Sequence, residues 1–134
     1  KPSSLIIANR SVAKALELAT PFADLGRLNA AGYDELNGTA FDLIINATSA
    51  SMGGDALPIP AGVFASGCLA YEMVYGKGMT TFLDQARRAG AQRLADGVGM
   101  LVEQAAEAFV WWRGVRPATA ALIQQLTVPL VPAP

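Results

Sequence analysis

Short apolar runs alternate with helical stretches along this chain, and that alternation predicts an α/β fold, with a mostly parallel sheet and helices on both faces. The clearest strand is Phe41–Asn46, whose sequence FDLIIN is typical of a strand buried on both faces. The clearest helix is Val98–Trp112. The 134 residues are enough for one domain.

The elements at the start of the chain follow in a strand, helix, strand order. Leu5–Ala8 is predicted to be a strand, and Ser11 is a plausible N-cap for a helix over Val12–Ala19. Thr20-Pro21 should end this helix, because a proline disfavours helical backbone in the residue before it. A short strand is expected around Arg27–Ala30.

The second half of the chain continues the alternation and then becomes helical. The expected elements after Phe41–Asn46 are a strand at Gly67–Val74, a helix at Thr80–Ala89, a strand near Gln92–Leu94, the helix Val98–Trp112 and a helix at Pro117–Leu126 that starts on its proline. We expect one domain over 1–134, with an α/β part at about 5–97, C-terminal helices at 98–127 and a frayed, proline-rich tail at 128–134.

Composition excludes several classes of function. The net charge is −1, which offers no electrostatic attraction for nucleic acid or for an anionic membrane. The apolar runs are far shorter than the roughly 20 residues that a membrane-spanning helix needs. Cys68 is the only cysteine and there is no histidine, so we expect no intrachain disulfide, no ordinary zinc site and a cytoplasmic location.

The first predicted strand ends in a cationic turn, Asn9-Arg10-Ser11, with Lys14 one helical turn further on. A nicotinamide-binding sheet that prefers NAD usually has an acid here, which holds the ribose 2′-hydroxyl. An amide, a guanidinium, a hydroxyl and an ammonium suit a 2′-phosphate instead, and therefore NADP. Two ordinary solvated cations are the alternative. The Gly-rich turn that should precede this strand is absent, so we expect a partial, incomplete Rossmann-like domain.

Two further segments follow predicted strands, where ligands bind in open α/β sheets. The sequence 46–51, NATSAS, has small residues that let a ligand approach and hydroxyls that could reach a ribose or phosphate. A generic polar turn is the alternative. In the next segment Met73 could lie against a flat ring, and Tyr75 could offer its phenol to a polar substrate. Both could equally be core residues.

The start and the middle of the long helix are also candidates. The glycines of Asp96–Met100 permit close backbone contact with a ligand. Gln104 falls on the apolar stripe, where a buried amide needs a partner. That partner could be a substrate hydroxyl or a backbone carbonyl. We expect Glu103 and Glu107 to be solvated, and Trp111-Trp112 to pack against this domain or a missing one.

The order of these motifs resembles shikimate dehydrogenase. The chain has Asn-Arg-Ser-x-x-Lys, Asn-Ala-Thr-Ser, Tyr-Glu-Met-x-Tyr with Thr80-Thr81-Phe82-Leu83, and Asp-Gly-x-Gly-Met-Leu-Val-x-Gln-Ala, at family-like spacing from about Leu5 to Leu126. The resemblance implies a cytoplasmic oxidoreductase of aromatic amino acid (chorismate) biosynthesis, which uses NADP and reversibly reduces 3-dehydroshikimate to shikimate.

The resemblance also implies roles for individual residues. The cofactor would contact Asn9, Arg10, Ser11, Lys14, Ala47, Thr48, Ser49, Met73, Gly97 and Met100, and the substrate would contact Tyr75 and Gln104. The family's catalytic Lys–Asp pair belongs to an N-terminal domain that is absent here, so no catalytic residue and no metal ligand is named in this chain. We expect these 134 residues alone to be inactive and to associate with a partner or with each other.

The chain departs from the family's pattern at two positions. Glu72 stands where Asp is usual, and Thr80-Thr81 stands where Thr-Pro is commoner. Glu72 adds a methylene, which puts the local geometry in question. Two other functions compete with the first: a quinate/shikimate dehydrogenase that accepts either alcohol, and a non-catalytic module that binds a nucleotide or a partner chain.

Overall fold

The structure of the protein is a computed structural model that describes residues 2–131. Residues 132–134 of the predicted frayed tail lie outside the described residues. Contacts divide the chain into two compact units. Unit 1 comprises the residues up to Ala40 together with Pro58–Val63, and unit 2 comprises Phe41–Leu57 and Phe64 onward. That they form one domain over 1–134 stays a prediction.

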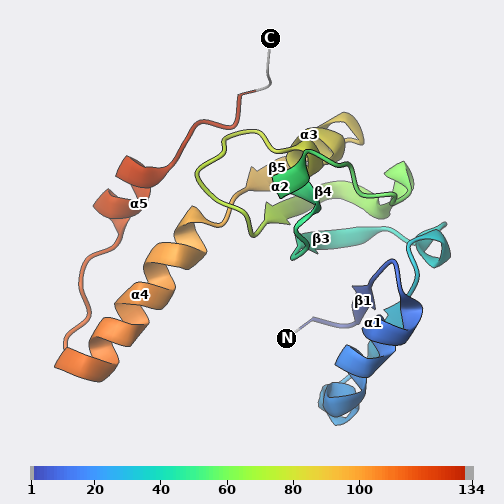
Figure 1. The fold of residues 1–134 in the computed structure, drawn as a ribbon, viewed down its shortest axis with the longest axis horizontal. Helices are drawn as coiled ribbons and strands as arrows, with labels where there is room; N and C mark the ends of the chain where they lie inside the picture. Colours follow the sequence, from blue (N-terminus) through green and yellow to red (C-terminus); the bar gives the residue numbers. More distant parts are fainter. Residues whose placement is uncertain (1, 132–134) are drawn as a thin grey trace. The chain divides into compact units, whose positions relative to one another are not determined.

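Unit 1 is a strand–helix–strand element (Figure 1). Strand β1 (Leu5–Ala8) pairs in parallel with β2 (Leu28–Ala31), and helix α1 (Val12–Ala19) joins them. Ala15 and Ala19 are the buried residues of α1. The α-helix ends at Ala19, as predicted from Thr20-Pro21, and the chain continues into a 3₁₀ helix over Thr20–Leu25, a geometry that accepts proline in its first turn. Two further 3₁₀ turns span Asp34–Leu36 and Ala61–Val63.

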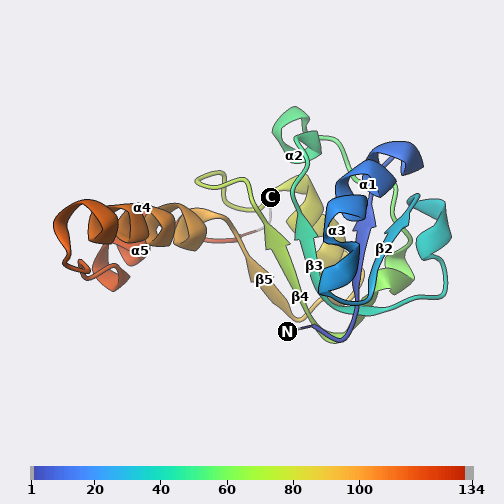
Figure 2. The same cartoon turned by 90° about the horizontal axis from the view of Figure 1, so that it is seen from below.

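Unit 2 contains a three-stranded parallel sheet in the order β3-β4-β5, seen side by side in Figure 2. The strands are β3 (Phe41–Asn46), β4 (Phe64–Glu72) and β5 (Arg93–Ala95). Helix α3 (Thr81–Arg88) supplies the largest buried side chains, Phe82 and Leu83, and the Phe82 ring lies 6.4 Å from the ring of Phe64. A short helix, α2 (Ala50–Gly53), follows β3.

Two more helices complete unit 2. Helix α4 (Val98–Arg113) is followed by α5 (Ala120–Leu126), which runs beside it (Figure 1). The prediction that the last helix starts at Pro117 was wrong by three residues. Residues 116–119 instead lie against α4, held there by side chains that pair with its glutamates. No helix in residues 2–131 is long and apolar enough to cross a membrane.

The α/β fold class is confirmed, but two expectations about the strands were wrong. Strand β3 is not buried on both faces, since Leu43 is 50% and Ile45 is 54% exposed. Within the described part of the chain β3 pairs only with β4, which leaves it at an edge. Strand β4 begins before Gly67, which has a φ of +81° where the register with β3 shifts, and it ends at Glu72 rather than at Val74.

Candidate cofactor and substrate site

The turn after β1 is open and cationic. The side-chain Oδ1 atom of Asn9 accepts a hydrogen bond from the backbone amide of Ser11 at 2.9 Å. The backbone amide of Asn9 donates to the Ala31 carbonyl at 3.1 Å. Ser11 is the N-cap of α1, as predicted, but its hydroxyl makes no capping bond. Arg10 and Lys14 are exposed, and neither takes part in the ion pairs seen among residues 2–131.

The segment after β3 is organised by a buried asparagine. The Nδ2 atom of Asn46 donates to Glu72 Oε2 at 3.0 Å and to Ser51 Oγ at 3.1 Å. Its Oδ1 atom accepts from the Thr48 amide at 3.0 Å and from the Thr48 hydroxyl at 2.7 Å. Both ends of the Asn46 side chain are therefore occupied by protein groups.

The carboxylate of Glu72 connects this segment to two others. Glu72 is fully buried, with 0% of its surface exposed. Its Oε2 atom also accepts from the hydroxyls of Ser51 at 2.6 Å and Thr80 at 3.2 Å, while Oε1 accepts from the Val74 amide at 3.2 Å. We call Glu72 and its four donors, Asn46, Ser51, Val74 and Thr80, the Glu72 network.

Position 97 must be glycine because the backbone of Met73 lies directly against it. A Cβ atom at this position would lie 2.2 Å from the carbonyl oxygen of Met73, a distance that backbone atoms cannot tolerate. The Gly97 amide also donates to the Val74 carbonyl at 3.3 Å. The next residues begin α4, where Asp96 Oδ1 accepts from the Val98 amide at 3.2 Å. Asp96 Oδ2 is buried and has no hydrogen-bond partner among residues 2–131. The contact predicted here was with a ligand, and it stays a prediction; the close approach that the structure shows is to the backbone of Met73.

The other candidates of unit 2 lie around these segments. Met73, Tyr75 and Met100 are exposed, as are Ala47 and Ser49, whereas Thr48 is half-buried. Gln104 is also exposed, and its Nε2 atom donates to the Leu101 carbonyl of its own helix at 2.9 Å. Exposed side chains therefore lie at the carboxyl ends of β3 and β4 and at the start of α4. The polar residues Asn46, Glu72 and Thr80 are buried close to them in the chain.

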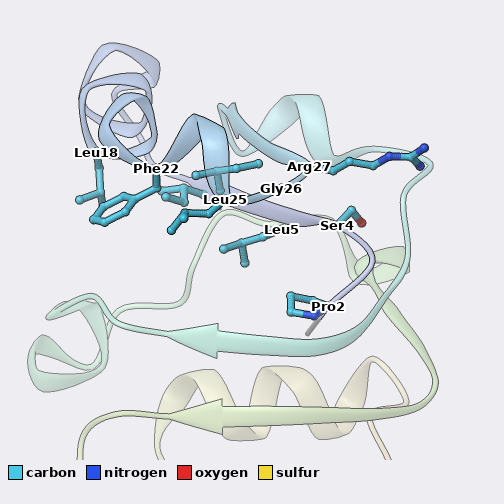
Figure 3. A pocket seen from close by; sticks show the side chains of 10 residues that line it. Pro2, Ser4, Leu5, Leu18, Phe22, Leu25, Gly26 and Arg27 are labelled. Atoms are coloured by element: carbon cyan, nitrogen blue, oxygen red, sulfur yellow. The ribbon is translucent and has the colours of Figure 1, made fainter.

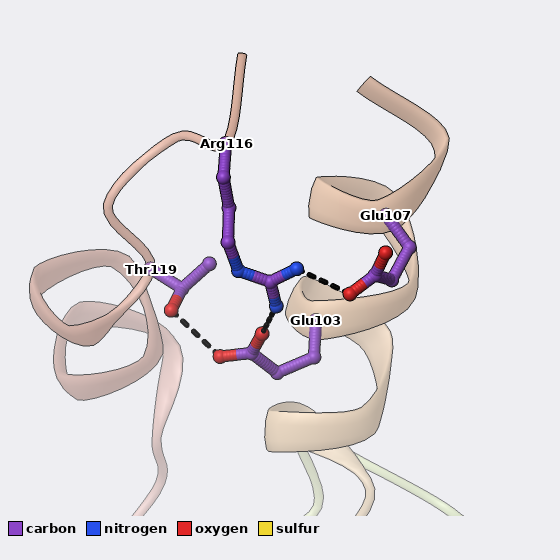
Figure 4. Close-up of polar contacts among 4 residues, drawn as sticks. All are labelled: Glu103, Glu107, Arg116 and Thr119. Carbon is purple, nitrogen blue, oxygen red and sulfur yellow. Dashed lines mark hydrogen bonds and ion pairs between the residues drawn. The ribbon is translucent and has the colours of Figure 1, made fainter. Parts of the chain in front are cut away.

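A cluster that sequence reasoning missed joins α4 to the segment before α5 (Figure 4). Arg116 pairs with Glu103 at 2.7 Å and also with Glu107, and the Thr119 hydroxyl donates to Glu103 at 2.6 Å. Glu103 and Glu107 are solvated, as expected, with 43% and 59% of their side chains exposed, but they are also paired with a segment that the sequence did not indicate as their partner. The Thr119 hydroxyl, and then the Arg116 guanidinium, lower the pKa of Glu103 below its ordinary value.

The two tryptophans and the apolar pocket of unit 1 are separate from the candidate residues. Trp111 and Trp112 are 86% and 80% exposed, so they do not pack against the described residues. The other expected possibility, packing against a missing domain, stays a prediction. A cavity of about 510 Å³ in unit 1 is lined by residues of β1, α1, the 3₁₀ helix Thr20–Leu25 and the start of β2, together with the residues just before β1 and β2 (Figure 3). They are Pro2, Ser4, Leu5, Ile7, Leu18, Phe22, Leu25, Gly26, Arg27 and Leu28. Most of these side chains are apolar, and the Arg27 guanidinium points away from Leu18, Phe22 and Leu25 (Figure 3).

These features define a class of protein before any comparison is made. Parallel strands are joined by helical crossovers, and polar loops lie at the carboxyl ends of the strands. This is the architecture of a Rossmann-like α/β domain, in which ligands bind at those strand ends. No group of three His, Cys, Asp or Glu residues that could hold a metal ion occurs in the described part of the chain.

Comparison with known proteins identifies the family that the chain resembles. Residues 97–127 match the model of the shikimate 5′-dehydrogenase C-terminal domain. The chain is 60% identical over 131 residues to the shikimate dehydrogenase (NADP⁺) of Dechloromonas aromatica. The aligned region covers 98% of this chain and 48% of that protein. The chain thus spans about half the length of the curated relatives it matches. The predicted resemblance to the C-terminal portion of shikimate dehydrogenase is confirmed.

Solved structures give the same result for the fold. The crystal structure of an Ael1 enzyme from Pseudomonas putida has 59% identity and a TM-score of 0.90, over 97% of this chain and 48% of that one. Shikimate 5-dehydrogenase from Thermus thermophilus, in complex with NADP(H) and shikimate, has 29% identity and a TM-score of 0.72, over 90% of this chain and 44% of that one.

Proposed function

We propose that this chain is the C-terminal, NADP-binding portion of a shikimate dehydrogenase, which reversibly reduces 3-dehydroshikimate to shikimate. The observation that carries the proposal is the 60% identity, over nearly the whole chain, to a relative with that name. The cofactor would supply or accept the hydride. We call a protein of the relatives' length that contains this chain the full-length enzyme.

The turn after β1 would bind the 2′-phosphate that distinguishes NADP from NAD. Arg10 and Lys14 stand at the start of α1, where the helix dipole disfavours cations unless an anion is present. Both side chains are exposed, and in the described part of the chain neither is neutralised by an acid. Asn9 and the uncommitted hydroxyl of Ser11 would add hydrogen bonds to the phosphate.

The strand ends of unit 2 would bind the rest of the cofactor and part of the substrate. Cofactor contacts are proposed for Ala47, Thr48, Ser49, Met73, Gly97 and Met100. Exposed Met73 and Met100 offer polarisable side chains for a flat ring. Tyr75 and Gln104 would hydrogen-bond the substrate, since the phenol is exposed and the Gln104 oxygen has no protein partner among the described residues.

The remainder of the relatives' length would supply the catalytic residues and cover apolar surface. Leu18, Phe22 and Leu25 are about half exposed around the cavity of unit 1. Such a patch marks an interaction surface or an aggregation liability. We expect the isolated 134-residue chain to self-associate, to bind NADP poorly and to be inactive. Sedimentation velocity would check this, and a monodisperse monomer that binds NADP at low micromolar concentration would contradict it.

The decisive test is turnover by the full-length enzyme. Shikimate and quinate are each offered with NADP⁺ and with NAD⁺, and reduced cofactor is followed by absorbance. Oxidation of shikimate with NADP⁺ as the preferred pair supports the proposal. Comparable oxidation of quinate would favour the broader quinate/shikimate activity, and no oxidation of either alcohol would refute both.

A cytoplasmic location, which rests on the lone buried cysteine, is part of the same proposal.

A further inference from the structure

The buried carboxylate of Glu72 accepts hydrogen bonds from three segments that carry or adjoin the candidate site. Its donors come from the loop after β3 (Asn46 and Ser51), from the loop after β4 (Val74) and from the N-cap of α3 (Thr80). Thr80 in turn accepts a hydrogen bond from the Leu83 amide at 3.3 Å, which caps that helix. One carboxylate therefore joins three segments that are separate in sequence.

All four donors of the Glu72 network bond directly to the carboxylate, three to Oε2 and one to Oε1. A carboxylate only accepts hydrogen bonds and has about four lone-pair sites, and Glu72 receives four donors. None of the ion pairs among residues 2–131 includes Glu72, so hydrogen bonds rather than a cation offset its burial. Loss of one acceptor would leave a buried donor unsatisfied, which costs more than the bond itself is worth.

The network reaches the candidate site through short links. Asn46, which donates to Glu72, holds both the amide and the hydroxyl of Thr48. Val74, which also donates to Glu72, lies between Met73 and Tyr75, and its carbonyl accepts from the Gly97 amide. The cofactor side and the substrate side of the candidate site thus depend on the same buried group.

We propose that Glu72 is a positioning residue for the reaction: its buried carboxylate fixes the loops after β3 and β4 relative to each other. This inference rests on the proposed function. It also explains how the chain accommodates Glu where the resembled family usually has Asp. The longer side chain reaches donors on all three segments at 2.6–3.2 Å.

The test compares Glu72→Gln with Glu72→Asp in the full-length enzyme. A glutamine must turn its NH₂ group toward at least one of the four donors, whereas an aspartate keeps both acceptor oxygens. We expect Glu72→Gln to lower kcat/KM by up to about 100-fold, because small displacements of reacting groups are costly. Glu72→Asp, which keeps both acceptor oxygens on a side chain shorter by one methylene, should recover part of that loss. The ratio of NADP to NAD efficiency should not change, since the turn after β1 is outside the network.

Amide hydrogen exchange provides a readout that is independent of activity. In Glu72→Gln we expect faster exchange in residues 46–54 and 73–80 and unchanged exchange in β5. Phe64→Leu is the matched control, since it perturbs a buried side chain at the opposite end of β4. Phe64→Leu should lower the melting temperature without changing the KM for shikimate or the KM for NADP⁺. Ser51→Ala, which removes only the shortest bond to Glu72, is the milder variant if Glu72→Gln does not fold.

Several outcomes would overturn the inference. Unchanged exchange in both loops of Glu72→Gln, or of Ser51→Ala if that variant is the one that folds, would show that the network does not hold them. Equal impairment of Glu72→Gln and Glu72→Asp would mean that shape matters and the acceptors do not. The same kinetic loss in Phe64→Leu would reduce the effect to general stability. If the unmutated enzyme does not oxidise shikimate, the proposed function fails, and the exchange data still decide whether Glu72 holds the loops.

Discussion

The turn after β1 and the loops after β3 and β4 all carry polar side chains, but they arrange these side chains in opposite ways. After β1, Arg10 and Lys14 are exposed to solvent, and the Asn9 side chain accepts a hydrogen bond from the backbone amide of Ser11. After β3 and β4, the polar side chains turn inward and bond to one another around Glu72. The first arrangement leaves charge available for a ligand, and the second uses its polar groups to fix the backbone.

This difference changes how the two motifs should be interpreted. The hydroxyls of residues 46–51 were expected to reach a ribose or phosphate, but Ser51 donates to Glu72 and Thr48 donates to Asn46. Ser49 is exposed, and the ligand contact that the motif suggested for it stays a prediction. The loops after β3 and β4 should therefore be sensitive to changes in packing, whereas the turn after β1 should tolerate substitution structurally and respond in ligand choice.

The largest expected effect concerns close packing against the loop after β4. Gly97→Ala places a methyl group against the Met73 carbonyl and should lower the free energy of unfolding by about 3 kcal/mol. Gly99→Ala is the matched control, because nothing lies within 4 Å of its Cβ position. In a helix it should leave stability unchanged or raise it by up to about 1 kcal/mol. Denaturant titration of both variants measures the difference, and equal stabilities would contradict the structure.

The next effect concerns the open turn. Arg10→Asp removes a charge-assisted hydrogen bond to the proposed 2′-phosphate and should reduce the NADP-over-NAD preference by roughly 10-fold to 150-fold. The melting temperature should hardly change. Arg27→Asp makes the same charge change at the other end of the β1–β2 pair and should leave the preference intact. Steady-state kinetics with both cofactors decide this, and an undiminished preference in Arg10→Asp would move the phosphate site elsewhere.

The sequence predicted the fold class and most elements because local patterns determine them. Helices α1 and α3 were predicted to within a residue, since an N-cap residue at Ser11 or Thr80 is followed by an amphipathic run. Strand β3 was predicted with correct bounds, but its burial was not. Burial depends on which strands pair with it, and among the described residues β3 has β4 alone.

The site was predicted less completely because its internal contacts join distant residues. Asn46, Glu72 and Thr80 were visible in the sequence only as members of separate motifs, and nothing local indicates that they share hydrogen bonds. The contact between Gly97 and Met73 was equally hidden. Arg116 had no visible partner, since its pairing with Glu103 depends on how the chain returns along α4.

A smaller effect is expected at Gln104, which is exposed and lies outside the Glu72 network. Gln104→Ala should lower kcat/KM for shikimate by roughly five- to tenfold, the value of about one hydrogen bond, and leave the affinity for NADP unchanged. Gln92→Ala, another exposed glutamine, should affect neither quantity. Kinetics combined with cofactor titration separate the two results, and weaker NADP binding by Gln104→Ala would assign Gln104 to the cofactor site.

The smallest effect concerns the exposed cluster at α5, which contrasts with the buried Glu72 network. Hydrogen bonding by Thr119 and pairing with Arg116 lower the pKa of Glu103 below its ordinary 4.5. A carboxyl group whose pKa is lower in the folded state stabilises the fold above its unfolded pKa, and this contribution is lost as the pH falls through the folded value. Protection of the Ile123 amide, which donates to the Thr119 carbonyl, should therefore decrease between about pH 6 and about pH 3. Glu103→Gln should remove this pH dependence while leaving kcat unchanged, as measured by amide exchange across that range. Identical pH profiles for the two proteins would show that Glu103 does not hold α5.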